Sequence, residues 1–220
     1  MNHYEEREKL AAAFMETRRR TLLLAEAIPP DARSLRVHPG YSPFDWHLGH
    51  IGMTEWLWAL QATGQVQSIN PELEFIFSNI PQNPKDNRSN LPDRVTILRY
   101  LRQVRERTLD FLQRADFDSP DPLLNDGYAF RFVLAHEWQH QETLIELLHL
   151  ISGAHPVTFL RRPYADAVTP YEQGAEIQIP VGTFIMGTDD SNAYDNERPA
   201  HEVTVGAFAI DELPVAVAQF

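Results

Sequence analysis

The sequence predicts an α+β protein in which a bundle of four long helices is followed by a β-rich segment. Apolar residues recur at helical spacing over most of the first 165 residues. After that point the segments EIQIP, GTFIMG and HEVTVGAFAI alternate as strands do and are interrupted by Gly and Pro. This change of pattern predicts two domains, residues 1–165 and residues 166–220.

The first two helices have recognisable ends. Residues 4–28 carry apolar groups at helical spacing, and a pair of prolines then stops the pattern. A second helix is predicted over residues 43–63. Ser42 supplies an N-cap, the next residue is a first-turn proline, and Asp45 places an acidic group three residues after the cap.

The third and fourth helices are predicted over residues 93–115 and 126–153. The third has an apolar side with arginines covering much of the rest, and Gly153 supplies a stop for the fourth. Residues 64–91 form a long connection, of a kind that is uncommon inside a compact domain and often functional. Four long helices suggest an antiparallel bundle, and the cores of such bundles often house metals.

Composition restricts the classes of partner. A hydrophobic content of 43% is that of a globular protein with a real core, and a formal charge of −12 argues against nucleic acid or an anionic membrane as the partner. No apolar run approaches the roughly 18 residues of a membrane helix, and the N-terminus lacks a secretory segment. We therefore expect a cytoplasmic protein. The absence of cysteine excludes disulfides and thiolate ligands, so any thiol in the chemistry arrives with a substrate.

Two pairs of histidines indicate a metal site. His136 and His140 are four residues apart and share one face of the fourth helix. His47 and His50 are three apart in the second helix, and a bundle can bring either of them against the first pair. The spacing does not choose between them. Five further histidines lack such partners, and we expect them to be surface or structural residues: His3, His38, His149, His155 and His201.

The stretch HEWQH also fits the H-E-x-x-H pattern of zinc proteases. In that interpretation Glu137 is the general base acting on a zinc-bound water. It requires a third ligand downstream and an edge strand to align a peptide, whereas the sequence continues as helix. Three neutral imidazoles would leave an ion its charge and open positions, which zinc uses to activate water and ferrous iron to bind substrate and dioxygen.

Four blocks of the chain resemble, in the same order, blocks of the ergothioneine-biosynthesis sulfoxide synthases. They are SPFDWHLGHIGMTEW, NPKDNRSNLP, HEWQHQET and IPVGTFIMGTDDSNAYDNERPAHEVTVGAFAI. This family consists of iron enzymes in which a DinB-like helical bundle is fused to a domain of the formylglycine-generating-enzyme type. The resemblance implies a DinB-like bundle followed by the first β-rich segment of such a domain.

The resemblance also implies a reaction and its residues. The family joins the sulfur of cysteine or γ-glutamylcysteine to the imidazole of N-α-trimethylhistidine, using Fe(II) and O2. It implies that His50, His136 and His140 bind the iron. Gln139 falls where the family contacts trimethylhistidine. Lys85 and Arg88 fall where basic residues hold the carboxylates of the thiol substrate, although the family has Arg at position 85.

The second domain is shorter than in the family. Relatives continue for about two hundred residues more, and the resemblance places a catalytic acid tyrosine and the groups that hold the trimethylammonium in that region. The β-rich segment of this chain is too small for a confident core of its own. We expect a fragment, a truncated relative, or a chain completed by a partner.

Two other functions remain open on the sequence alone. A DinB-like zinc or nickel protein, either a hydrolase or a thiol transferase, would use the same three histidines without O2. A non-catalytic metal-binding relative with a degenerate β-rich tail would act as an assembly or regulatory piece.

Overall fold

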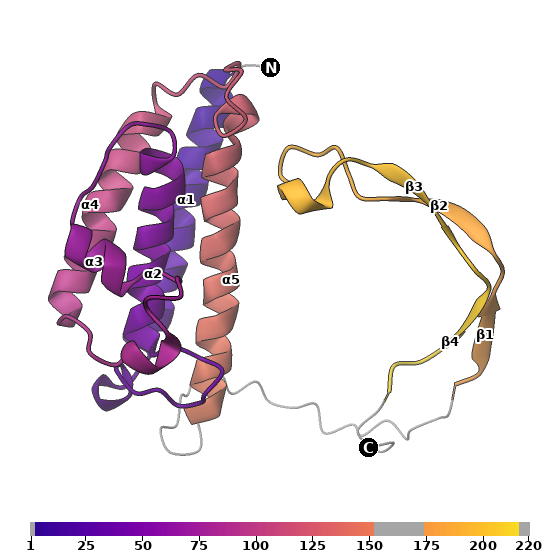
Figure 1. The fold of residues 1–220 in the computed structure, drawn as a ribbon, viewed down its shortest axis with the longest axis horizontal. Coiled ribbons are helices and arrows are strands. Elements are labelled where there is room, and N and C mark those ends of the chain that lie inside the picture. The colour runs from indigo at the N-terminus through magenta and orange to yellow at the C-terminus, as the bar shows by residue number, and fades with distance from the viewer. Residues whose placement is uncertain (1–2, 152–173, 216–220) are drawn as a thin grey trace. The chain divides into compact units, whose positions relative to one another are not determined.

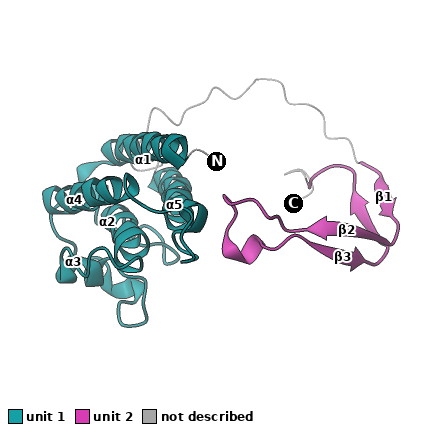
Figure 2. Ribbon diagram, turned by 90° about the horizontal axis from the view of Figure 1, so that it is seen from above, with its two compact units in different colours: residues 1–161 teal, residues 162–220 magenta. Residues whose placement is uncertain are grey.

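The computed structural model describes residues 3–151 and 174–215. The chain divides into two compact units, residues 1–161 and residues 162–220 (Figure 2). The predicted domain boundary after residue 165, the predicted stop at Gly153 and His155 lie outside the described residues. Each unit is considered by itself below.

The first unit is a bundle of four long helices (Figure 1). They are α1 (His3–Glu26), α2 (Phe44–Glu55), α4 (Arg94–Leu112) and α5 (Tyr128–Ile151). Helix α2 packs against α4 and α5, while α1 packs against α5 and α4. The four predicted helices are therefore confirmed. Within the described residues, no helix combines the length and the apolar character needed to cross a membrane.

Helix α2 continues as a π-helix, Trp56–Gln61, so that the whole helical run ends close to its predicted end. Its start differs from the prediction. Pro43 rather than Ser42 occupies the N-cap position, and a proline side chain has no acceptor to cap the helix. The hydroxyl of Ser42 accepts a hydrogen bond from Arg88 at 3.1 Å. Asp45 likewise does not cap the helix, since Arg94 of α4 binds its carboxylate at 2.7 Å.

The bundle core is largely apolar but contains a cluster of buried, paired charges. Large buried side chains include those of Phe14, Tyr100 and Phe130. Each long helix contributes one charged residue to this buried charged cluster, whose members are Arg18, Glu55, Arg105 and Glu137. Arg18 binds both carboxylates, at 2.9 and 2.8 Å, and Arg105 binds them at 2.8 and 2.7 Å. Alternating pairing of this kind compensates the cost of burying each charge.

The long connection between α2 and α4 is more ordered than the sequence suggests. It contains a short helix, α3 (Pro71–Ile76), which is capped by the Asn70 side chain, and a 3-10 turn, Lys85–Asn87. The ring of Phe77, just after α3, packs on α2 at Gly49, where a Cβ atom would meet ring carbons at 2.2–2.3 Å. This close approach places the Phe77 backbone against the neighbouring residue His50.

The second unit contains two antiparallel strand pairs. Strand β1 (Glu176–Ile179) pairs with β4 (Phe208–Asp211), and β2 (Gly182–Met186) pairs with β3 (His201–Val205). The predicted strand segments are confirmed, and HEVTVGAFAI divides into β3 and β4 at Gly206. Gly187 ends β2 with a positive φ of 79°, where a Cβ atom would lie 2.7 Å from a backbone oxygen. The two units together show the predicted α+β organisation.

Candidate metal centre

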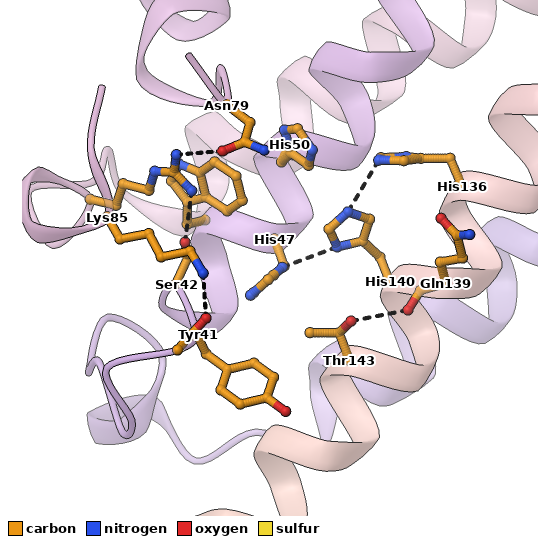
Figure 3. A pocket seen from close by; sticks show the side chains of 13 residues that line it. Tyr41, Ser42, His47, His50, Asn79, Lys85, His136, Gln139, His140 and Thr143 are labelled. Atoms are coloured by element: carbon orange, nitrogen blue, oxygen red, sulfur yellow. Dashed lines mark hydrogen bonds between the residues drawn. The ribbon is translucent and has the colours of Figure 1, made fainter. Parts of the chain in front are cut away.

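Helices α2 and α5 bring four histidine rings together in the first unit (Figure 3). One nitrogen each of His50, His136 and His140 lies within 4.8 Å of the others. The ring centroids of His50 lie 5.2 Å from His136 and 5.1 Å from His140. Among the described residues, this is the trio whose ligand atoms converge. The geometry therefore favours His50 over His47 as the third member.

A hydrogen bond and a stacking contact fix the orientation of the His50 ring. Its Nδ1 lies 2.7 Å from the carbonyl oxygen of Phe77, and a carbonyl can only accept, so Nδ1 carries the proton and Nε2 is left with its lone pair. The indole of Trp46 stacks on the ring at 4.5 Å with an interplanar angle of 14°. A ring nitrogen held by a carbonyl while the other is free is the usual arrangement of a metal-binding histidine.

The other two rings are spaced as ligands of one ion are. The Nε2 atoms of His136 and His140 lie 3.2 Å apart. Two imidazole nitrogens that each bind the same ion at about 2.1 Å are separated by roughly 3.0–3.4 Å, depending on the angle between them. The donor set therefore fits an ion that prefers imidazole ligands, such as zinc, copper, iron or nickel.

Burial keeps these rings neutral. It lowers the pKa of His50 to about 4, with Arg88 adding to the effect, and the pKa of His136 to about 3, with His50 adding to it. The pKa of His140 is lowered too, by burial and then by His136. Neutral imidazoles have lone pairs for a metal at physiological pH, so the cluster needs no deprotonation before it binds an ion.

His47 lies beside the trio rather than within it. Its Nδ1 is 3.0 Å from Nδ1 of His140, and its ring meets Trp46 edge to face at 5.4 Å. Burial, followed by the nearby His50, lowers its pKa to about 3. The Nε2 atom is buried without a hydrogen-bond partner among the described residues.

The zinc-protease interpretation of HEWQH is wrong, because the Glu137 carboxylate points into the buried charged cluster and not towards the histidines. Its carboxylate accepts hydrogen bonds from Arg18 at 2.8 Å, Arg105 at 2.7 Å and Thr21 at 2.7 Å. Although burial opposes it, pairing with the two arginines lowers its pKa to about 2. A carboxylate held in this way is not available as a general base in the pocket. Trp138, on the outer side of α5, is half exposed.

A pocket of about 400 Å³ opens in front of the histidines. Arg88 forms part of its wall and is nearly fully buried, with its guanidinium 4.1 Å from the centre of the Trp46 ring. It donates to the carbonyl of Asn83 at 2.9 Å and to Asn79 at 2.8 Å, so the side chain is held in one position. A rigidly held cation therefore forms part of the pocket that the histidines line.

The other two residues implied by the resemblance also line this pocket. Lys85 donates from Nζ to the carbonyl of Gly40, and Gln139 is exposed one residue before His140, with its backbone carbonyl accepting from Thr143 at 3.1 Å. Nothing in the sequence indicated that Tyr41, Asn79 or Thr143 belongs to the site, but all three line the same pocket. Helical periodicity could not identify the first two, because they come from irregular segments.

Each of the two parts of the chain matches the model of a known protein family. Residues 13–144 match the model of the DinB superfamily, and residues 164–220 match that of the sulfatase-modifying factor enzyme 1-like domain. A hercynine oxygenase of Mycolicibacterium smegmatis is 33% identical over 222 residues, covering 97% of this chain and 49% of the relative. That of Mycolicibacterium thermoresistibile is 33% identical over 227 residues, covering 97% and 47%.

The second unit has a further relative. The inactive C-alpha-formylglycine-generating enzyme 2 of Mus musculus is 50% identical over 46 residues, which cover 21% of this chain and 15% of the relative. The chain spans about half the length of the hercynine oxygenases that it matches.

Proposed function

Because the chain belongs to the DinB superfamily and joins this bundle to a sulfatase-modifying-factor domain, as the hercynine oxygenases do, we propose that it serves ergothioneine-type sulfoxide synthesis. The substrates are N-α-trimethylhistidine, O2, and cysteine or γ-glutamylcysteine. One C–H and one S–H bond are replaced by a C–S bond, one oxygen atom goes to sulfur as the sulfoxide, and the other leaves as water.

The observation that carries this proposal is the convergence of His50, His136 and His140 at the floor of a pocket large enough for small substrates. These three residues would hold Fe(II). Bound iron would supply the redox chemistry with O2, and three neutral protein ligands would leave it open positions. The resident side chains would supply alignment, and they keep much of the floor from water, since His50 is buried and His136 and His140 are partly buried.

Arg88 and Lys85 are the groups proposed to hold the carboxylates of the thiol substrate. Both line the same pocket as the histidines, so a bound amino acid would have its sulfur near the metal while its carboxylate meets a cation. Arg88 is preorganised by Asn79 and Asn83, which limits the ordering cost of binding. Lys85 offers a point charge rather than a planar fork.

Gln139 is proposed to contact trimethylhistidine, since it lies on the α5 side of the pocket next to His140. By the resemblance, the acid tyrosine and the groups that hold the trimethylammonium belong to the later part of the sulfatase-modifying-factor domain or to a partner chain. The proposal for the complete reaction therefore applies to the site together with that part.

Anaerobic metal loading tests the proposal. The 220-residue chain is titrated with Fe(II) and, separately, with Zn(II), and the same is done with His50→Ala, His140→Ala and the control His149→Ala, whose residue is exposed at the end of α5. One Fe(II) per chain, lost in the first two variants and kept in the control, is the expected result. Binding of Zn(II) but not Fe(II) would favour the hydrolase or thiol-transferase alternative. No binding would leave a non-catalytic relative.

A further inference from the structure

His47 is a buried titratable residue for which the proposed reaction has no role. It comes from α2, one turn before His50, and is 6% exposed. Its ring lies between the wall formed by the 41–42 segment and His140 (Figure 3). Buried polar side chains normally have hydrogen-bond partners, so the partners of His47 indicate its role.

The contact that matters joins Nδ1 of His47 to Nδ1 of His140 at 3.0 Å. A hydrogen bond between two imidazole nitrogens needs one that carries a proton and one that does not. The proton can therefore lie on His140, with His47 accepting, or on His47, with His140 accepting. These two states have opposite consequences for the metal site.

If His140 accepts through Nδ1, its own proton is on Nε2, which is the nitrogen 3.2 Å from Nε2 of His136. That nitrogen then has no lone pair for a metal. If His140 donates from Nδ1, Nε2 is free, in the same tautomer that the Phe77 carbonyl imposes on His50. A metal at the cluster requires the second state.

We propose that His47 is a positioning residue, which accepts the Nδ1–H of His140 through its own Nδ1 and so directs the free Nε2 of His140 towards the metal. This inference rests on the proposed metal centre and adds a residue to it. His47 takes the place that a carbonyl or carboxylate fills behind most metal-binding histidines.

The surroundings of His47 hold it in the required orientation. Trp46 packs edge to face on its ring at 5.4 Å. With Nδ1 of His47 accepting from His140, the proton of the neutral His47 ring is on Nε2. No atom among the described residues meets Nε2 in full hydrogen-bond geometry, so the contact with His140 is the one that fixes the ring.

The experiment compares Zn(II) affinity by competition titration in the 220-residue chain and in two variants without an acceptor, His47→Leu and His47→Phe. The rescue variant is His47→Asn, whose Oδ1 branches at the position of Nδ1 and can accept from His140. His149→Phe is the control. We expect the two acceptor-free variants to lose about 10–100-fold in affinity and His47→Asn to recover most of it.

Long-range ¹H–¹⁵N spectra of the zinc-loaded chain report the tautomers directly. We expect a protonated Nδ1 on His140, an unprotonated Nδ1 on His47, and loss of the His140 Nδ1–H signal to exchange in His47→Leu. If the variants do not fold, the wild-type tautomers alone decide: the reverse assignment overturns the inference.

Three other results would distinguish a failure of the inference about His47 from a failure of the proposed function. Wild-type affinity in folded His47→Leu and His47→Phe would overturn this inference and leave the proposed function intact. Loss of binding as complete as in His140→Ala, without rescue by Asn, would make His47 a ligand and overturn its positioning role. A wild-type chain that binds no ion would overturn the proposed function itself.

Discussion

The backbone carbonyl of Phe77 lies 2.7 Å from Nδ1 of His50, although the two residues belong to different segments. Phe77 follows the short helix α3, and His50 lies in the middle of α2. The contact exists because Gly49 has no side chain, so the Phe77 ring can lie directly on the helix. The orientation of one candidate ligand thus depends on the packing of a residue from the long connection.

Gly49→Ala should therefore weaken both stability and metal binding. The new Cβ atom would lie 2.2 Å from the Phe77 ring, so the ring must shift and take its carbonyl with it. We expect a loss of about 1–3 kcal/mol in the free energy of unfolding, measured by urea titration, together with weaker Zn(II) binding. Gly206→Ala is the control, because nothing lies within 4 Å of its added Cβ. Unchanged stability would show that the connection adapts freely.

Arg105→Met should strongly destabilise the bundle. Arg105 binds Glu55 at 2.8 Å and Glu137 at 2.7 Å, and its removal leaves two buried carboxylates with Arg18 as their remaining cation. Breaking a buried ion pair from one side costs about 3–5 kcal/mol. The control is Arg19→Met, whose pair with Glu16 lies on the surface, so its loss should change stability little. Equal effects of the two substitutions on chemical denaturation would contradict this prediction.

Arg88→Met should reduce the affinity for the thiol substrate while leaving the metal in place. Arg88 lines the pocket but is not one of the three convergent histidines. Loss of a charge-assisted hydrogen bond costs about 1.5–3 kcal/mol, equivalent to roughly 10–150-fold in the dissociation constant of cysteine or γ-glutamylcysteine, measured anaerobically on the metal-loaded chain. The control is Arg107→Met, on an exposed part of α4. Unchanged thiol affinity would remove Arg88 from the proposed substrate site.

The metal-free protein should lose stability on mild acidification. The folded-state pKa values of His50 (about 4) and His136 (about 3) lie below the ordinary value of 6.5, so between these limits the unfolded chain binds more protons. Stability is therefore complete above about pH 6.5 and falls as the pH drops below it, by up to about 1.4 kcal/mol per pH unit for each histidine. Glu137, with its pKa near 2, adds to this loss only below its ordinary value of 4.5.

Urea midpoints at several pH values between 5 and 8, in the presence of a chelator, measure this dependence. His136→Gln should make the slope shallower, because one buried neutral group is removed. A midpoint that stays constant between pH 7 and pH 5 would show that the rings are not held neutral in the folded state.

The helices and strands could be predicted because each leaves a periodic pattern in the sequence. The apolar face of α4 and the alternation in β2 are local features, and the structure confirms both. The capping role predicted for Ser42 was wrong, since Pro43 is the N-cap residue and the hydroxyl of Ser42 accepts from Arg88 of the long connection. Helix α3 was missed, because its six residues are too few to show a period within a long connection.

The candidate site was partly predictable, because part of it also leaves a periodic pattern in the sequence. The spacing of His136 and His140 places them on one face of a helix, whatever packs against it. The choice of His50 over His47 depends on how α2 is rotated against α5, which spacing does not determine and a family resemblance could only imply. The contact between His47 and His140, like the orientation of Glu137 into the buried charged cluster, depends on packing between helices and left no sequence signal that we recognised.

The buried charged cluster also fixes the axial positions of the four long helices relative to one another. Arg18, Glu55, Arg105 and Glu137 each come from a different long helix, and sliding α5 by one turn, about 5.4 Å, would break its pairs with both arginines. Apolar layers alone tolerate such slippage more easily. Glu55 lies on the same helix as His50, and Glu137 directly follows His136. The ion pairs that fix the axial positions of α2 and α5 therefore also fix the axial positions of the candidate ligands. The two halves of the site are thus aligned with each other before any ion arrives.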